Sequence, residues 1–403
     1  MSREIFKRVE GRSPAFLLLI GGLGLLVLLG MGSAWTMEHH GHVITGMNNR
    51  IVWGMPHVFA VFLIVAASGA LNVASISSVF GRTAYKPLSR LSVMLAIALL
   101  VGGLSVLVLD LGRPDRLIVA MTTYNFRSIF AWNIYLYVGF IAIAGVYLWL
   151  MMERSLNKYS KPAGLVAFIW RLALTTGTGS IFGFLVARQA YDAAIMAPLF
   201  IAMSFAFGLA IFILVIMFSS QGTGRVLGEA MMRRLKNLLG VFVAAVLYFT
   251  VVQHLTDLYA AEHHAVERFI LAEGGIYTKL FWVGQIAIGG ALPLVLLFTP
   301  MFADSRKAIA LAALSVIVGG MAQLYVLIIG GQAFPLVLFP GKIVSSSFAD
   351  GSIAAYNPGL PEIGLGIGGV ALALVIVAMS VKILALLPRT LADTLADADT
   401  DPT

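Results

Sequence analysis

The sequence predicts an all-α polytopic membrane protein with about ten transmembrane helices, and three observations lead to this fold class. Of the 403 residues, 60% are hydrophobic and 11% are charged, and the mean hydropathy of +0.94 lies outside the range of soluble domains. Runs of about 18 or more mostly apolar residues recur along the chain, and each is long enough to cross a bilayer core. The segments between these runs are too short to form a soluble domain.

The predicted spans are residues 14–35, 52–80, 88–110, 128–152, 163–188, 195–220, 235–259, 277–299, 305–331 and 362–387. The first resembles a signal peptide, but its apolar stretch is longer than a typical one, so we predict an uncleaved helix. The net charge is +8, and most of the 27 Lys and Arg residues fall in the predicted loops on the side of the termini. The positive-inside rule therefore predicts cytoplasmic termini in the cell inner membrane, and it explains the basic excess without nucleic-acid binding.

The second span carries the main candidate for a functional site. It begins I-V-W-G-M-P-H-V-F, and Pro56 suits a helix start because its missing N–H would be unpaired there. His57 shares one helix face with Ser68, Asn72 and Ser75. An ionisable residue inside a span is costly and by default marks a functional site. For Ser68 and Ser75 we favour close helix packing, which small residues allow.

The third span ends at Asp110, because the G-R-P sequence that follows turns the chain outward. The loop L-D-L-G-R-P-D-R places Asp110 level with His57 at the predicted outer edge. Asp110 is predicted either to pair with Arg113 or Arg116 or to relay protons, and the two roles are compatible.

The fifth span contains a charged residue about two turns inside its cytoplasmic end. Arg171, Thr175, Thr178 and Gln189 share one face, which predicts a proton path from the cytoplasm toward the level of His57. The alternative is that the Arg171 side chain snorkels to the cytoplasmic surface.

Further polar features lie elsewhere in the chain. Thr250, His254 and Asp257 share a face of the seventh span near its outer boundary. The outer loop 332–361 is partly apolar, and loops of that length usually cap a pocket or dock a partner. The tract E-H-H-G-H at 38–42 offers imidazoles to a metal ion or forms a solvated polar loop.

The chain has no cysteine, which excludes disulfides, iron–sulfur clusters held by this chain and covalently attached c-type haem. If electrons pass through the protein, their carriers therefore belong to a partner or are diffusible.

Five motifs occur in order along the chain. They are W-G at 53–54, L-D-L-G-R-P at 109–114, N-x-R-S at 125–128, W…G…P…P through 282, 289, 293 and 300, and G-Q…Y-x-P…E through 331, 332, 356, 358 and 362. On these motifs most of the chain resembles the membrane-subunit family typified by polysulfide reductase and the NrfD-like proteins. The form W-G-M-P-H-V-F…S-G-A-L-N is most similar to the DsrP branch, from the Dsr complexes of sulfur metabolism.

The resemblance implies two four-helix bundles, at 52–194 and 195–331. The N-terminal segment and first helix, 1–51, and the outer loop, last helix and acidic tail, 332–403, are then peripheral. It also implies a membrane subunit of a multi-subunit respiratory oxidoreductase, without a tightly bound cofactor of its own. Menaquinone or ubiquinone from the membrane lipid would be its substrate, and a periplasmic ferredoxin-like iron–sulfur subunit its partner.

The family's quinone site implies roles for several residues at the outer edge of the first bundle. Its histidine ligand corresponds to His57, which hydrogen-bonds one quinone carbonyl and passes a proton. Its tyrosine ligand corresponds to Tyr191, with Tyr124 and Tyr135 as the alternatives. A carboxylate such as Asp110 can replenish the proton, and Trp53 or Phe59 can flank the quinone ring. Arg113 is also predicted to belong to the quinone-binding residues.

Two other functions remain open from the sequence. A cytochrome b would ligate haem through His57 and His254, although one membrane histidine per bundle is a poor start. A proton-coupled secondary transporter would use Arg171, Asp110 and Asp257 as its substrate or ion path.

Overall fold

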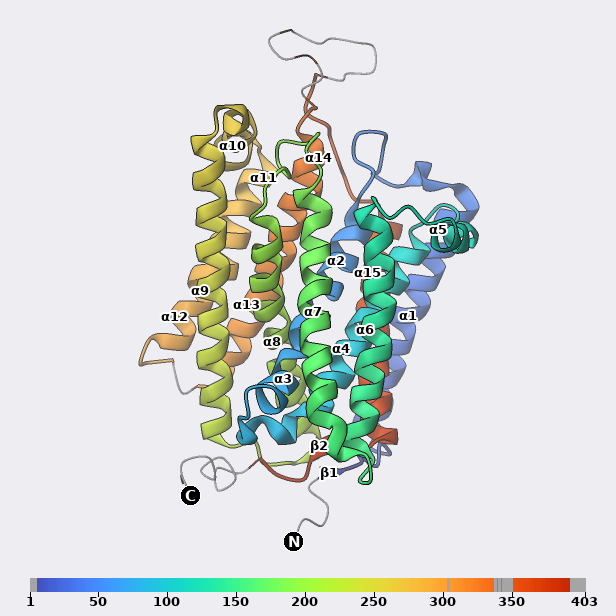
Figure 1. Ribbon diagram of the computed structural model, residues 1–403, viewed down its shortest axis with the longest axis vertical. Helices are drawn as coiled ribbons and strands as arrows, with labels where there is room; N and C mark the ends of the chain where they lie inside the picture. The colour runs from blue at the N-terminus through green and yellow to red at the C-terminus, as the bar shows by residue number, and fades with distance from the viewer. Residues whose placement is uncertain (1–5, 303–304, 337–338, 340–341, 343–350, 392–403) are drawn as a thin grey trace.

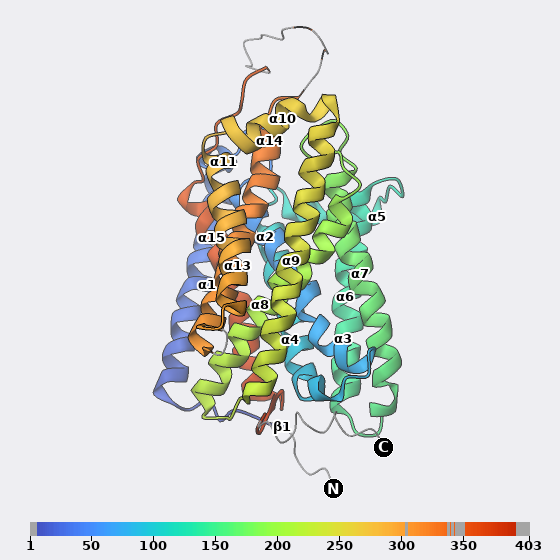
Figure 2. The same cartoon turned by 90° about the vertical axis from the view of Figure 1, so that its left-hand side faces the viewer.

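A computed structural model describes residues 6–302, 305–336, 339, 342 and 351–391, and it confirms the all-α membrane fold (Figure 1). Its described residues contain ten helical segments that are long and apolar enough to cross a membrane. These segments run along the long axis of the molecule (Figure 2). Such apolar runs form helices because the bilayer core contains no water to bond the backbone N–H and C=O groups, which an α-helix bonds within the segment.

The α-helices of the described residues are α1 (Pro14–His40), α2 (Met55–Ala70), α3 (Asn72–Ser78), α4 (Ser89–Leu109), α5 (Leu117–Thr122), α6 (Ile129–Met152), α7 (Ser160–Gly183), α8 (Met196–Thr223), α9 (Glu229–Tyr259), α10 (His264–Arg268), α11 (Ile276–Lys279), α12 (Leu292–Phe298), α13 (Arg306–Tyr325), α14 (Gly331–Ala333) and α15 (Leu360–Ile383). The π-helical segments are η6 (Phe269–Glu273), η7 (Leu280–Ala291) and η8 (Val326–Gly330). Short 3-10 helices are η1 (His42–Ile44), η2 (Thr83–Leu88), η3 (Pro114–Arg116), η4 (Asn157–Tyr159) and η5 (Ala261–His263), and the strands are β1 (Phe6–Lys7) and β2 (Leu387–Pro388).

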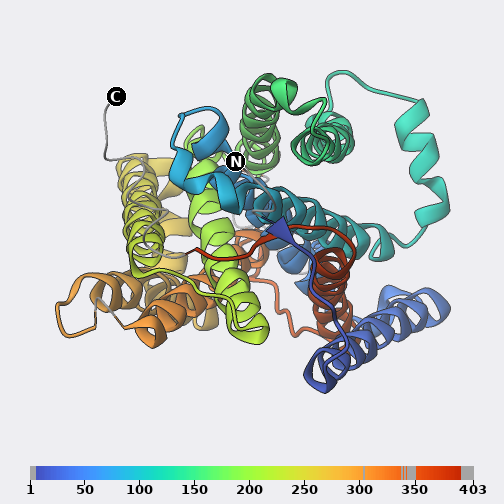
Figure 3. The same ribbon diagram turned by 90° about the horizontal axis from the view of Figure 1, so that it is seen from below.

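Helix α2 lies at the centre of the molecule. It packs extensively against α4 in the first half of the chain and against α8 in the second half. Helices α6 and α7 complete the first group. Helices α9 and α13 pack against α8, and η7 packs against α13 and α9. Helix α1 packs along α15, and α15 packs on α4, so the first and last spans lie together at one side (Figure 3). Only glycine fits where α1 crosses α15, because a Cβ on Gly30 would lie 2.7 Å from the Gly368 Cα.

Both ends of the described chain lie at the same end of the molecule (Figure 1). There β1 pairs antiparallel with β2, with Phe6 opposite Pro388. The Arg225 guanidinium donates hydrogen bonds to the backbone carbonyls of Leu387 and Pro388. We call the opposite end the distal end; it carries the N-terminus of α2 and the C-terminus of α4.

Two helices end earlier than the apolar runs predict. Helix α7 stops at Gly183 rather than at 188, because the chain folds back so closely that a Cβ there would lie 2.7 Å from the Ala193 carbonyl oxygen. Gln189 therefore does not continue the face of α7. The second span is interrupted at Leu71, where α2 gives way to α3.

Candidate functional site

His57 is positioned in the first turn of α2 by a glycine that admits no side chain. Helix α2 begins after Gly54, and Pro56 occupies its first turn as predicted. A Cβ on Gly54 would lie 2.5 Å from the Glu362 carboxylate and 2.8 Å from the Tyr356 hydroxyl. The W-G motif is thus a steric requirement that fixes where the helix starts and where His57 lies.

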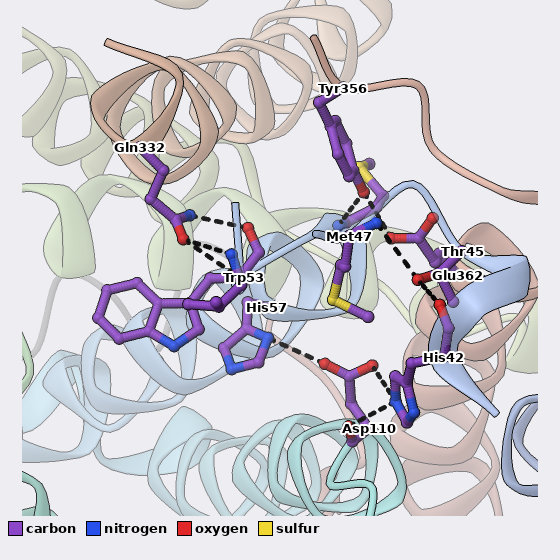
Figure 4. A network of polar contacts seen from close by, with 11 residues as sticks. His42, Thr45, Met47, Trp53, His57, Asp110, Gln332, Tyr356 and Glu362 are labelled. Carbon is purple, nitrogen blue, oxygen red and sulfur yellow. Dashed lines mark hydrogen bonds and ion pairs between the residues drawn. The ribbon is translucent and has the colours of Figure 1, made fainter. Parts of the chain in front are cut away.

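Asp110 lies between two histidines, His57 and His42 (Figure 4). Its Oδ2 is 2.9 Å from His57 Nδ1, and its Oδ1 is 3.8 Å from His42 Nε2. His42 Nε2 also donates to the Asp110 backbone carbonyl at 2.9 Å. His57 Nδ1 and Asp110 Oδ2 face each other at ion-pair distance, and neither atom has another partner among the described residues. We call these three residues the distal relay.

The charges of the distal relay follow from burial and contact. Burial disfavours the ionised form of Asp110, but its contacts with His42 and His57 outweigh burial, so the pKa of Asp110 lies below its usual value. The contact with the Asp110 carboxylate raises the pKa of His42. The His42 side chain is 28% exposed and the Asp110 side chain 2% exposed. The relay therefore joins a buried carboxylate to an imidazole that reaches the surface.

Trp53 extends the site beyond His57. Its ring stacks beside the His57 ring with centroids 6.0 Å apart, and Phe130 and Phe182 lie 5.9 Å and 5.8 Å from it. The His57 side chain is 19% exposed, and no described residue bonds its Nε2. Phe130 and Leu109 expose apolar surface on this part of the molecule. His57 thus has one nitrogen engaged with Asp110, while its Nε2 is available to a ligand.

Gln332 fixes the backbone of Trp53 (Figure 4). Its Oε1 accepts from the Val52 and Trp53 N–H groups at 2.9 and 3.0 Å, and its Nε2 donates to the Trp53 carbonyl at 2.9 Å. The side chain is buried at the distal end of the ninth span. The second half of the chain therefore positions the aromatic residue beside His57.

A second network holds the start of α2 from the other side. The Tyr356 hydroxyl accepts from the Met55 N–H and donates to Glu362 Oε1, both at 2.6 Å. Glu362 Oε2 accepts from the Gly46 and Gly359 N–H groups. Glu362 is fully buried, and its oxygens are satisfied, so its role is to tie α15 to the loop that carries His42.

The remaining predicted quinone residues do not all join this site. The Tyr191 ring lies 6.5 Å from Trp53, but its hydroxyl donates to the Ile328 carbonyl at 2.6 Å. Tyr124 packs instead against Tyr135, with ring centroids 4.9 Å apart. The expectation that Asp110 pairs with an arginine is wrong, because the histidines occupy its carboxylate. The Arg113 guanidinium is exposed at the surface, where it forms an ion pair with Asp115.

Arg171 is fully buried where α7 packs against α3 and α8, so the expectation that it snorkels to the surface is wrong. Its Nη2 donates to Asn72 Oδ1 at 3.0 Å, and its guanidinium lies 4.8 Å from the ring centroids of both Phe168 and Phe205. Its Nε and Nη1 have no hydrogen-bond partner among the described residues. Unpartnered donors of this kind are normally satisfied by water.

Hydroxyls continue from Arg171 along α7 toward the distal end. Thr175 donates to Ser68 on α2 at 2.5 Å, so Ser68 bonds across the helices as well as packing. Thr178 faces α6, where its hydroxyl is 3.5 Å from Asn133 Oδ1 and 3.4 Å from the Tyr137 hydroxyl. The polar series therefore passes from the α2 side of α7 to the α6 side.

Gln189 and His57 lie outside this series. Gln189 is in the turn after α7, its Oε1 is buried without a hydrogen-bond partner among the described residues, and its backbone carbonyl accepts from His263. No described side chain joins the series to His57 by hydrogen bonds. A proton route between Arg171 and the distal relay would thus require water.

The two histidines of the haem alternative are not brought together. His57 lies on α2, and His254 lies on α9 with its Nδ1 2.8 Å from Glu267 Oε2. In the tract at 38–42, His42 turns to the distal relay. Within the described residues, no three His, Asp or Glu side chains are arranged to hold a metal ion.

Sequence reasoning missed four residues of the site: His42, Gln332, Tyr356 and Glu362. The last three occupy the G-Q…Y-x-P…E motif. The motif marked these positions, but the sequence did not show which residues they contact. They contact residues of the loop before α2 and its first turn from 279 to 316 positions away, a separation that no local pattern reveals.

The fold and the site together define a multi-pass membrane protein with a His–Asp–His relay at one end of a helical bundle. The family model described as polysulphide reductase, NrfD, matches residues 43–336, and the chain belongs to this family.

Three relatives align with most of their own length. The Hdr-like menaquinol oxidoreductase integral membrane subunit of Archaeoglobus fulgidus is 29% identical over 387 residues, which cover 95% of this chain and 97% of the relative. The C subunit of the polysulfide reductase of Wolinella succinogenes is 23% identical over 310 residues, covering 71% and 96%. The menaquinone reductase integral membrane subunit of Nitratidesulfovibrio vulgaris is 22% identical over 388 residues, covering 89% of each protein.

Proposed function

We propose that this chain is the quinone-reactive membrane subunit of a respiratory oxidoreductase complex, with its quinone site at His57. The observation that carries the proposal is the distal relay, in which a buried carboxylate links a surface imidazole to one whose Nε2 is available beside Trp53. Relatives named as menaquinol oxidoreductase and menaquinone reductase subunits support a quinone as the substrate, menaquinone or ubiquinone.

The relay suits the proton chemistry of a quinone. Reducing a quinone at both oxygens takes two electrons and two protons. His57 hydrogen-bonds one carbonyl oxygen through Nε2 and transfers a proton there, since an imidazole can act as a general acid and a general base. Asp110 keeps the ring oriented and stabilises its cationic form, and His42 exchanges protons with water at the surface. Trp53 flanks the quinone ring, with Tyr191 packed behind it through its aromatic face.

The test of the quinone site uses the fluorescence of Trp53. A short-chain quinone that binds beside this indole should quench part of the emission of the purified protein in a saturable way. Trp53→Phe should lose the saturable component, whereas Trp149→Phe, at an exposed position on α6, should keep it. Saturable quenching of equal depth in the Trp53→Phe variant would place the quinone elsewhere.

We propose that the electrons pass to or from another subunit, since this chain has no cysteine to hold an iron–sulfur cluster. We propose that a periplasmic ferredoxin-like iron–sulfur subunit docks at the distal end, which then faces outward from the inner membrane. The residues that line a cavity of about 630 Å³ there include Arg50, Arg188, Gln332, Phe334 and Ser352. The relative named polysulfide reductase supports a role in sulfur metabolism. Much of the predicted docking loop, 343–350 included, lies outside the described residues.

Crosslinking tests this docking. Photoreactive residues placed at Asn49 and Phe126 on the distal loops should crosslink to the iron–sulfur partner in the native complex. The same residue placed at Lys158, in the loop between α6 and α7 at the end with the termini, should not. Crosslinks found only at Lys158 would contradict the proposed orientation.

A further inference from the structure

The distal end of α9 carries buried polar side chains that the distal relay does not use. Thr250, Gln253 and Asp257 follow one another at helical spacing, and their side chains are 2%, 7% and 6% exposed. The Asp257 carboxyl and the Gln253 amide form no hydrogen bond or ion pair with any described residue. Neither side chain belongs to the polar atoms that are fully enclosed without a partner, so both keep access to water and can exchange protons with it.

Asp257 is surrounded by titratable groups from the elements packed against it. Its electrostatic neighbours are Glu267, His263, His254 and Asp192. Glu267 is 1% exposed and already has a partner, since its two oxygens lie 3.0 and 2.8 Å from His254 Nδ1. His263 donates its Nδ1–H to a backbone carbonyl. Asp257 is thus the buried acid of this group that lacks a donor among the described residues.

The series Asp257, Gln253 and Thr250, which we call the polar column, ends at a small cavity beside Thr250. It measures about 20 Å³, and its polar lining consists of Thr250, Gln285 and Gln323. Both glutamine Nε2 atoms approach the Thr250 hydroxyl within 3.5 Å. This volume holds about one water molecule, and three polar partners are enough to bind it. Thr250 lies roughly 10 Å along the helix axis from Asp257, at 1.5 Å per residue.

Beyond the cavity at Thr250, on the side away from Asp257, the next buried residues of α9 are apolar. Val243 and Val246, on α9, line the same cavity, and Leu239 is buried one turn further along. Toward the first bundle, Phe207 lines the cavity and stacks on Phe62 of α2 with ring centroids 5.1 Å apart. A proton that enters from the distal end therefore reaches the middle of the second bundle and meets apolar described residues beyond it.

We propose that Asp257 is a proton-binding site in the second bundle, with a polar half-path that opens to the distal surface. One carboxylate oxygen binds the proton, and the carboxyl then donates to the amide of Gln253 or to water. The His254–Glu267 pair exchanges that proton with the distal side, and the water-sized cavity at Thr250 is the inner end. This site lies in a different bundle from His57 and does not depend on the proposed quinone function.

Infrared difference spectroscopy of the purified complex tests the site without turnover. A pH titration should show the carbonyl-stretch band of a protonated carboxyl group, shifted in D2O. Asp257→Asn should remove this band, and the matched variant Glu262→Gln, whose side chain is 75% exposed in the wild type, should retain it. Asn has nearly the shape of Asp, and the thermal unfolding temperature reports whether the variant is folded.

Two further variants in the same infrared experiment test the proposal independently of the quinone site. His57→Ala should keep the Asp257 band even when quinone chemistry is lost, which separates the two proposals. Glu267→Gln removes a neighbouring negative charge, so the band should disappear at a lower pH than in the wild type. A band of unchanged intensity in Asp257→Asn would overturn the proposal. A wild-type band that Na⁺ abolishes at constant pH would also overturn it, because the occupant would then be a metal cation.

Discussion

Replacing His57 with alanine is expected to slow quinol-linked electron transfer by about 10²- to 10⁴-fold, the usual contribution of a positioned acid or base. The imidazole is the member of the distal relay with an available nitrogen beside Trp53, and no other described side chain offers a proton donor held by Asp110 at this position. The side chain is partly exposed at the start of α2, so truncation leaves the core of the bundle intact.

The measurement is quinol oxidation or quinone reduction by the reconstituted complex, with assembly checked by co-purification. His57→Gln separates the two roles of the ring, because an amide donates a hydrogen bond but does not relay a proton. We expect this variant to keep quinone binding in the Trp53 quenching assay and to lose turnover. His40→Ala, at an exposed histidine of the same end, is the matched control. Normal turnover of His57→Ala with the natural quinone would contradict the proposed site.

Replacing Arg171 with leucine is expected to abolish the coupling of quinone chemistry to membrane potential. We propose that the series Arg171, Thr175 and Thr178 carries protons from the side of the termini toward the distal relay, as its sequence pattern predicts. Gln189 lies outside the series, so water completes the path to His57. Two guanidinium nitrogens have no partner among the described residues, which supports water at this depth. Leucine removes both the donors and the charge that hold such water, and hydrocarbon does not conduct protons.

Potential generation by reconstituted vesicles during turnover measures this coupling. Arg171→Lys keeps a charge and is expected to retain part of it. Arg171→Leu leaves Asn72 Oδ1 without its donor, so the thermal unfolding temperature and co-purification with partners check the folding of each variant. If rate and coupling both stay unchanged in the leucine variant, protons enter through the exposed imidazole of His42 at the distal surface, and the inner path is refuted.

The sequence alone determined the ten candidate spans, the all-α fold and the position of His57 and Asp110 at the same end of neighbouring helices. These follow from the length of the apolar runs and from where Gly and Pro end them, both of which are local properties. The prediction was less accurate at Gly183, where α7 ends because the returning chain approaches it closely. An apolar run shows how far a helix can extend but not where the next segment crosses it.

The tertiary structure alone decided the partners of the polar groups. Asp110 has two arginines within six positions along the chain, yet it contacts His57 and His42 instead, because helix packing buries its carboxylate beside them. Gln332 reaches the backbone of Trp53 from 279 positions away. A buried polar group takes whichever partner packing places within hydrogen-bond reach, and that distance is set by the arrangement of the helices rather than by spacing along the chain.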